Sequence, residues 1–393
     1  MTRPLDGITV ISLEHAIAAP FCTRQLADLG ARVIKIERPG SGDFARAYDT
    51  RVRGQSSHFV WTNRSKESLT LDLKHPQAMA VLRQLLGQAD VLVQNLAPGA
   101  AARMGLSYAE LSVLHPRLIV CDISGYGEDG PYRDKKAYDL LIQSEAGLLS
   151  ITGSPDEPAK AGNSMADIAA GMYAYSNILS ALLLRERVGQ GSHIDVSMLE
   201  ALTEWMGYPL YYAFEGAPPP PRSAAAHASI YPYGPFAAGD GGTVMLGLQN
   251  EREWAAFCRT VMAAPALAED PRFANNAARS AHRAELRALI LQTFGQMSTA
   301  QVIARLDEAG IANARMNEMA DVWAHPQLQA RDNWVTVDSP AGPIPALRPP
   351  GRQNRFAPRM DPVPAVGAHT DAILRQLGHS DADIAAMRAQ HII

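Results

Sequence analysis

The chain has few cysteines, no excess of basic charge and no long apolar run. Its cysteines, Cys22, Cys121 and Cys258, are odd in number and widely separated, which argues against a disulfide framework and favours a reducing compartment. The formal net charge of −4 gives no sign of a nucleic-acid surface. No apolar run approaches the roughly 20 residues that span a bilayer, and residues 1–15 lack a signal-peptide pattern. We therefore expect a cytoplasmic protein that binds neither nucleic acid nor membrane.

What the chain does have is an alternation of short β-branched runs with amphipathic segments from residue 7 to residue 124. The near-continuous apolar character of the strand-like runs is typical of a parallel sheet with helices on both faces. A long helix is predicted from Met165 to Arg187. At 393 residues, the chain exceeds the roughly 100–200 residues of one domain. We expect a doubly wound, Rossmann-like α/β domain and a smaller α+β domain.

The first strand, helix and strand, ending in Glu37, have the outline of a dinucleotide-binding unit. The glycine-rich turn of such a unit is missing, because the sequence there is HAIAAPFC, and this excludes the NAD reading. The segment after Glu37 carries Arg38 and Arg46 around a glycine turn, which could hold phosphates by charge and backbone amides. A surface loop with solvated arginines is the alternative.

Eight segments, in order and almost from end to end, resemble the type III coenzyme A transferases, a family that is related to α-methylacyl-CoA racemase. They are IKIERPGSGDFAR, NRSKESLTLDLKHP, VLVQNLAPGAAARMGL, DISGYGEDGPY, AYDLLIQSEAGLLSITG, SMADIAAGMYA, LLLRERVGQGSHIDVSMLEA and GAHTDAILRQLG. The resemblance implies a large CoA-binding domain of residues 1–215 and 330–393, and the sequence pattern predicts HTDAILRQLG as the last helix of the chain. A proline-rich linker at 216–228 and a small domain at 229–329 complete the chain. The family also forms interlocked homodimers.

The resemblance places the catalytic nucleophile at Asp167, in SMADIAAGMYA. Small neighbours would let a ligand approach, and the first turn of a helix favours the charged form of a carboxylate, which attack on a thioester requires. Without the resemblance, Ser164 and Asp167 would instead be interpreted as a capping box at the start of a helix.

The resemblance also implies the remaining site. CoA contacts are implied at Ala18, Arg38, Asn95, Leu96, Arg103, Met104 and Lys136, and substrate contacts at His15, Ile17, Tyr138 and His227. The racemases have a histidine where this chain has Tyr138, so racemisation is disfavoured. No metal and no permanently bound cofactor is expected, because the CoA thioester is itself a substrate.

Among subgroups, the segments look most like transferases of C4 and C5 dicarboxylates. They predict transfer of CoA from succinyl-CoA to itaconate or a close analogue, through an aspartyl anhydride and an aspartyl-CoA thioester. Intramolecular transfer between C1 and C4 of mesaconyl-CoA, an acyl-CoA racemase and a non-catalytic CoA-binding protein stay open as alternatives. Arg46, Arg51, Arg53 and Arg222 are candidates to bind the free carboxylate of a dicarboxylate.

Overall fold

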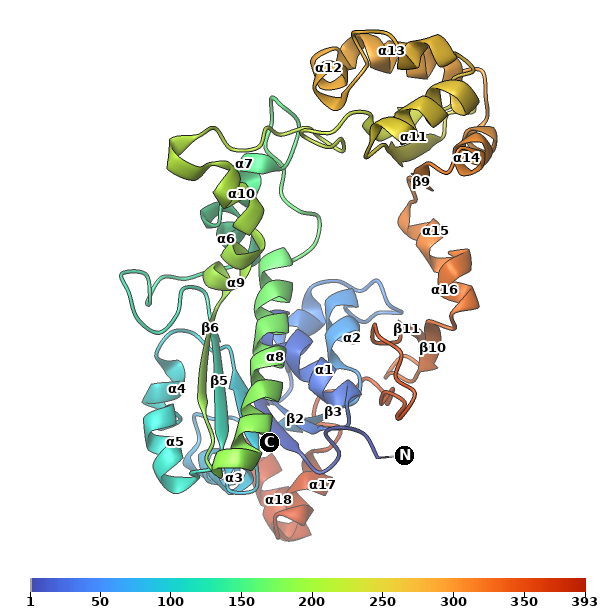
Figure 1. Cartoon of the computed structure of the whole chain (residues 1–393). Coiled ribbons are helices and arrows are strands. Elements are labelled where there is room, and N and C mark those ends of the chain that lie inside the picture. Colours follow the sequence, from blue (N-terminus) through green and yellow to red (C-terminus); the bar gives the residue numbers. More distant parts are fainter. Residues whose placement is uncertain (1) are drawn as a thin grey trace. The chain divides into compact units, whose positions relative to one another are not determined.

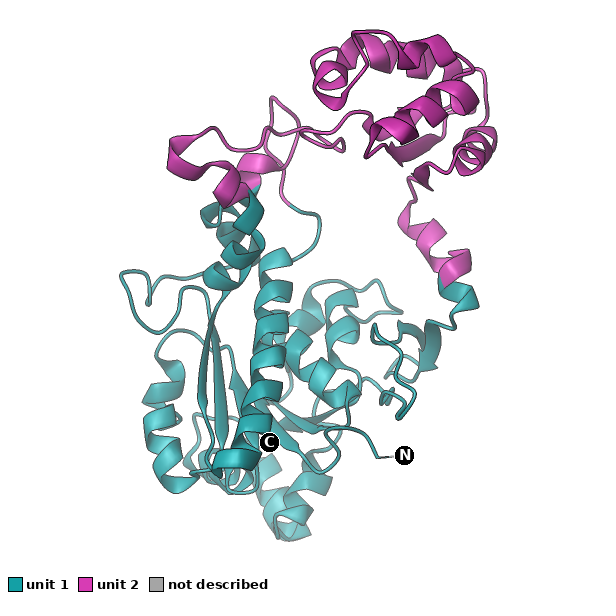
Figure 2. Cartoon of the chain, viewed as in Figure 1, with its two compact units in different colours: residues 1–148, 161–208, 328–393 teal, residues 149–160, 209–327 magenta. Residues whose placement is uncertain are grey.

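The computed structural model describes residues 2–393, which divide into two compact units. Unit 1 comprises residues 1–148, 161–208 and 328–393, and unit 2 comprises residues 149–160 and 209–327 (Figure 2). Each unit is described by itself below. The predicted domain boundaries and the linker at 216–228 stay predictions.

Unit 1 is built on a parallel sheet of six strands in the order β3-β2-β1-β4-β5-β6 (Figure 1). This is the doubly wound order in which the strand sequence reverses between β1 and β4. The predicted Rossmann-like sheet is therefore confirmed. The strands are β1 (Thr9–Leu13), β2 (Arg32–Glu37), β3 (Lys66–Thr70), β4 (Val91–Gln94), β5 (Ile119–Ser124) and β6 (His193–Ser197).

Helices cover both faces of this sheet, because alternate side chains of its strands point to opposite faces and both sets are apolar. Val10 of β1 belongs to the core beneath α1 and α8, whereas Ile11 belongs to the core beneath α3, α5, α17 and α18. The helices of the unit are α1 (Ala18–Asp28), α2 (Ser57–Asn63), α3 (Pro76–Leu86), α4 (Ala100–Arg103), α5 (Tyr108–Leu114), α6 (Asp139–Glu145), α8 (Met165–Val188), α9 (Met198–Trp205), α17 (Thr370–Gln376) and α18 (Asp381–Ala389).

The long helix α8 packs closely on α1 through small residues. Ala166, Ala169, Ala170 and Gly171 are buried there, and a Cβ on Gly171 would lie 2.7 Å from the carbonyl oxygen of Ala18. Among the described residues, α8 is the one helix long and apolar enough to cross a membrane. Its small residues belong to the core of unit 1, which is typical of the central helix of a folded domain.

The C-terminal residues return to unit 1, with a β10 (Trp334–Val337) and β11 (Ile344–Leu347) hairpin before α17. The prediction that HTDAILRQLG forms the last helix is wrong, because α18 follows it. Ser380 caps α18 with a capping box, and Ile384 and Met387 of α18 are buried beside α17. The three cysteines are buried and unpaired, as predicted.

Unit 2 has its own aromatic core and combines an antiparallel sheet with helices, which confirms an α+β architecture. Trp254, Phe257, Phe273 and Phe294 are buried together in it. The sheet order is β7-β8-β9, with β7 (Tyr233–Ala237), β8 (Thr243–Gly247) and β9 (Ala312–Arg315). Its longer helices are α11 (Glu251–Ala256), α12 (Asn276–Ala281), α13 (Arg283–Phe294) and α14 (Thr299–Glu308). The short helices α7 (Leu148–Ile151) and α10 (Gly207–Tyr212) cross the unit boundaries, and α15 (Met319–Trp323) precedes α16 (Pro326–Ala330).

Candidate active site

The site is built around the loop that joins β1 to α1. Ala16 has a φ of 60°, a left-handed conformation that an alanine rarely adopts. Its N–H donates to Oδ1 of Asp43 over 3.3 Å. The side chain of Asn95 fixes the backbone of His15 from the other side, since its Oδ1 accepts from the His15 N–H at 2.8 Å and its Nδ2 donates to the His15 carbonyl at 2.9 Å. The loop therefore enters α1 in one defined path.

A buried network of charged side chains contacts this loop and holds it in place. The Nζ of Lys35 lies 2.8 Å from Oδ2 of Asp43 and 3.3 Å from Oε1 of Glu14, and the Nζ of Lys66 lies 2.6 Å from the same Glu14 oxygen. Burial alone would raise the pKa of Asp43, but the charge of Lys35 and hydrogen bonding by His15, Lys35 and the Ala45 N–H together lower it. Asp43 therefore stays ionised and continues to accept the N–H of Ala16. The sequence analysis missed this network, because its members are scattered along the chain from residue 14 to residue 66.

Asp167 is the third residue of α8 and lies against the first residue of α1. The backbone N–H of Ala18 is close to its carboxylate and acts to lower its pKa. The capping-box alternative finds no support, because Ser164 makes no side-chain capping bond at the start of α8. Burial, followed by the charge of Asp139, raises the pKa of Asp167 to about 7. The expectation that the helix start favours the charged form is thus wrong for the net effect.

Asp139 fixes the start of α8 and lies beside Asp167, and the sequence analysis did not single it out. Its Oδ1 accepts from the N–H of Ala166 at 2.8 Å, and its Oδ2 accepts from Nε2 of Gln143 at 2.7 Å. These bonds hold one carboxylate beside another, the arrangement that raises the proton affinity of Asp167. The adjacent sequence match at Tyr138 was the available signal.

Aromatic side chains lie in the neighbourhood of the Asp167 carboxylate. The rings of His15 and Phe44 stack with centroids 5.2 Å apart, and Phe44 contacts Tyr48 at 5.7 Å. Burial raises the pKa of the Tyr48 phenol, and the nearby charges of Asp43, Asp167 and Tyr138 raise it further. Tyr48 therefore joins Tyr138 and Asp167 in one neighbourhood. Phe44 and Tyr48 are both about half exposed, so this part of the site is open to solvent.

The predicted substrate contacts differ in how accessible they are. Tyr138 is 72% exposed at the start of α6, whereas Ile17 is only 3% exposed and belongs to the buried core. His227 belongs to unit 2, where its ring stacks on Tyr233 and its Nδ1 accepts from the N–H groups of Ser229 and Ile230. Its predicted role in substrate binding stays a prediction.

The predicted CoA contacts lie at the ends of the strands and the loops that follow them. Arg38 follows β2, Arg103 ends α4, and Lys136 precedes α6, and all three are exposed. Leu96 lines a cavity of about 500 Å³, and Met104 packs on the core beneath α5. Arg46 is not available for phosphate, because it forms a bidentate pair with Glu37 at 2.8 and 2.7 Å.

Comparison with known proteins identifies the reaction class. The model of CoA-transferase family III matches residues 5–370. The chain belongs to CoA-transferase family III. This transferase is 35% identical to a succinate–glutarate CoA-transferase of Agrobacterium fabrum, over 95% of this chain and 96% of the relative. It is 31% identical to the human succinyl-CoA:glutarate CoA-transferase, over 95% of this chain and 86% of that protein.

A solved structure supports the same assignment. The crystal structure of a CAIB/BAIF family protein from Brucella suis has a TM-score of 0.86 to this transferase at 34% identity, covering 96% of this chain and 100% of that one. The family assignment made from the eight segments is therefore confirmed, and so is the identification of the chain as a CoA-transferase that uses CoA thioesters as substrates.

Proposed function

We propose that Asp167 is the nucleophile of a reaction that moves CoA from succinyl-CoA to a short dicarboxylic acid. The observation that carries this proposal is the position of the Asp167 carboxylate beside the Ala18 N–H at the start of α1, where that N–H acts to lower the pKa of the carboxylate. The first N–H groups of a helix have no partner within the helix, so they are available to anions. The same helix start that binds the carboxylate can therefore stabilise an oxyanion beside it.

The proposed transfer takes four steps. A carboxylate oxygen of Asp167 attacks the thioester carbonyl, the C–S bond breaks, and CoA leaves as a thiolate with the electron pair. The thiolate then attacks the aspartyl carbonyl of the mixed anhydride, which releases succinate and leaves an aspartyl-CoA thioester. The acceptor carboxylate displaces the thiolate to form a second anhydride. The thiolate finally attacks the acceptor carbonyl and regenerates Asp167.

The acceptor is proposed from the sequence and from the names of relatives. The sequence predicts itaconate, a C5 dicarboxylate, and two of the relatives are named for transfer to glutarate, also a C5 dicarboxylate. Others are named for citramalate and malate with succinyl-CoA. These acids share a second carboxylate, which needs a cation or several donors in the site.

Arg51 is the one of the four arginines considered from the sequence whose side chain has no hydrogen-bond or ion-pair partner among residues 2–393. Arg46 is paired with Glu37, Arg53 donates to the carbonyl of Pro343, and Arg222 donates to the carbonyls of Ser154 and Pro155. Arg51 is exposed and follows Tyr48 by three residues, and within residues 2–393 it has no ion pair. We assign it to the free carboxylate of the acceptor.

Trapping the covalent intermediate tests the nucleophile. Enzyme is incubated with succinyl-CoA, treated with hydroxylamine or borohydride, digested and analysed by mass spectrometry. The peptide that contains Asp167 should carry the modification, and Asp167→Asn should lose transfer by on the order of 10⁴-fold while still binding CoA. Asp156→Asn, which changes an exposed aspartate, is the matched control. An unmodified Asp167 peptide during turnover would overturn the covalent mechanism.

A panel of acceptors tests the substrate class. Rates with succinyl-CoA are compared for itaconate, glutarate, malate, mesaconate and monocarboxylates of similar length. Dicarboxylates should be preferred, and Arg51→Gln should raise the KM of the dicarboxylate with less effect on kcat. Arg53→Gln should leave that KM unchanged. Equal rates with monocarboxylates would exclude the proposed acceptor class.

A further inference from the structure

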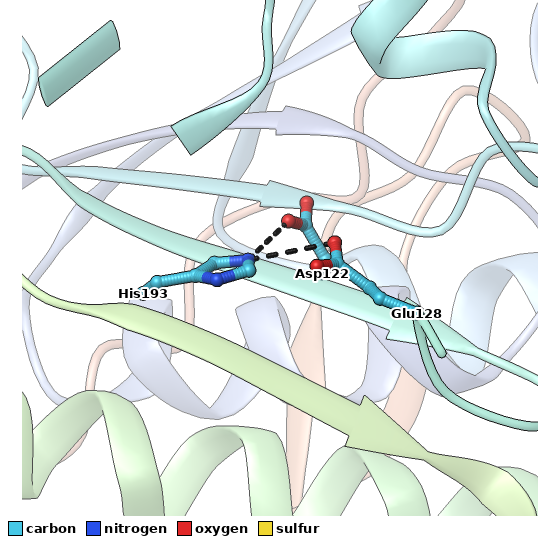
Figure 3. A group of neighbouring side chains, drawn as sticks. All are labelled: Asp122, Glu128 and His193. Carbon is cyan, nitrogen blue, oxygen red and sulfur yellow. Dashed lines mark hydrogen bonds and ion pairs between the residues drawn. The ribbon is translucent and has the colours of Figure 1, made fainter. Parts of the chain in front are cut away.

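A second group of reactive side chains lies at the sheet edge formed by β5 and β6, apart from Asp167. Asp122 is on β5 and pairs with Asp195 of β6, and His193 of β6 is opposite Val120. Asp122 and His193 are therefore two positions apart on neighbouring parallel strands, and side chains two positions apart project from the same face. Glu128, from the loop after β5, completes the group (Figure 3).

The three side chains converge on one point. Nε2 of His193 lies 2.8 Å from Oδ2 of Asp122 and 3.5 Å from Oε1 of Glu128. One ligand atom from each residue lies within 4.8 Å of the other two. Bonds of about 2.0–2.2 Å to a tetrahedral ion place ligand atoms about 3.3–3.6 Å apart, so shifts of well under 1 Å would seat an ion among these three.

The side chains of Asp122 and His193 and the backbone of Glu128 are each held by a separate contact. Nε2 of Gln94 donates to Oδ1 of Asp122 at 2.8 Å, which leaves Oδ2 directed at His193. The ring of Tyr108 stacks on His193 with centroids 5.1 Å apart and an angle of 8°. The N–H of Glu128 donates to Oδ2 of Asp195 at 3.0 Å and fixes the loop. Second contacts of this kind orient the ligands in metal sites of proteins.

The group opens on the cavity of about 500 Å³, which leaves room for a further ligand. All three side chains line this cavity, together with Leu96, Tyr108 and Arg133. Asp122 is buried, whereas Glu128 is half exposed, so an ion has a route of entry from the cavity side. Two carboxylates at this spacing repel one another, and a divalent cation would remove that repulsion.

We propose that Asp122, Glu128 and His193 form a binding site for a divalent transition-metal ion, with Zn²⁺ as its best representative. An imidazole nitrogen with two carboxylate oxygens favours Zn²⁺, Co²⁺ or Mn²⁺ over Mg²⁺ and Ca²⁺, which prefer oxygen ligands alone. The bound ion joins the loop at Glu128 to the edge strand of the sheet. This site is independent of the covalent mechanism, because none of its residues takes part in the transfer steps.

Metal titration of the full chain tests the site. Protein freed of metal with a chelator is titrated with Zn²⁺ by calorimetry, without CoA, and with Co²⁺ by visible absorption. One ion per chain should bind, and the Co²⁺ bands should have the intensity of a site with fewer than six ligands. Glu128→Gln, which alters a half-exposed loop residue, should weaken binding at least tenfold. Gln94→Ala should weaken it about 10- to 100-fold through loss of the contact to Asp122.

A matched histidine separates this site from adventitious binding. His193→Gln should lose the stoichiometric ion and the Co²⁺ absorption, whereas His115→Gln, at the end of α5, should retain both. Zn²⁺ should also raise the Tm of the parent protein and not that of His193→Gln. The proposal would be overturned if His193→Gln and Glu128→Gln bound the ion as strongly as the parent protein does. It would also be overturned if the parent protein bound no stoichiometric ion.

Discussion

The proposed role of Asp167 as nucleophile requires an ionised carboxylate, whereas its surroundings raise its pKa. Moving its pKa from 3.8 to about 7 corresponds to about 4 kcal/mol at 1.36 kcal/mol per pH unit. A helix dipole contributes only about 0.3–1 kcal/mol at such a position. Burial and Asp139 therefore decide the charge state, and the proton leaves near neutral pH.

The pH dependence of transfer should report this group. Because only the ionised carboxylate attacks, kcat/KM should rise with pH, reach half its maximum near pH 7, and then level off. Asp139→Asn retains an oxygen for the N–H of Ala166 but removes the neighbouring charge, so its profile should move to lower pH. Rates are measured with limiting succinyl-CoA in buffers of constant ionic strength. A flat profile between pH 5 and pH 8 would contradict the assignment.

The same pKa has a consequence for stability. Between pH 4 and pH 7 the folded state retains a proton on Asp167 that the unfolded state has released, so its contribution to stability falls as the pH rises. Asp167→Asn removes this loss. It should increase the free energy of unfolding by on the order of 1–3 kcal/mol at pH 8, after a discount for partial exposure, and change it little below pH 4. Urea unfolding at both pH values measures the difference, and Asp156→Asn should change neither.

What the sequence predicted about the site differed from residue to residue. Asp167 was singled out because its segment matches a family, and its catalytic role stays a prediction. Asp139 and Tyr48 were missed, because their importance comes from what they face across the fold. Asp122, Glu128 and His193 were missed for the same reason, since no short spacing in the sequence joins them.

At the scale of elements, the contact between α1 and α8 sets the distance from Asp167 to the Ala18 N–H. Periodic apolar patterns predicted both helices, because each buries one face against the sheet. The closeness of the two helices depends on Gly171, where a Cβ would come within 2.7 Å of the Ala18 oxygen and 3.1 Å of the Phe21 ring. A backbone atom of α1 cannot move aside as a flexible side chain would.

Gly171→Ala should therefore separate the two helices. Overpacking costs about 1–3 kcal/mol, whereas alanine in a helix interior gains up to about 1 kcal/mol over glycine. We expect a net loss of about 0–2 kcal/mol in the free energy of unfolding and a larger fall in kcat than in CoA affinity. Gly207→Ala, at the start of α10 with open space around it, is the control. An unchanged kcat in Gly171→Ala would show that this spacing is not critical.

At the scale of the whole molecule, the parallel sheet was predictable because each strand and helix had a local signal. The last helix was misassigned because the short segment around Asp381 has only a weak apolar periodicity. The feature that marks it as a helix is the capping box at Ser380. Association between chains has no such local signal, and the prediction of a homodimer rests only on the family resemblance. In unit 2, the stretch 209–214 nevertheless exposes four large apolar side chains: Leu210, Tyr211, Tyr212 and Phe214. A concentration of this kind marks an interaction surface.

From the resemblance to the family we expect a homodimer in which the two chains pass through each other. Light scattering after size exclusion should give the mass of two chains. Two batches with different mass tags, mixed in the folded state, should not form mixed dimers over days, because interlocked chains can separate only by unfolding. The same mixture unfolded in denaturant and refolded should contain about half mixed dimers, which shows that the tags do not prevent pairing. Mixed dimers that form without denaturant would indicate an ordinary interface, and a monomer at all concentrations would exclude the dimer.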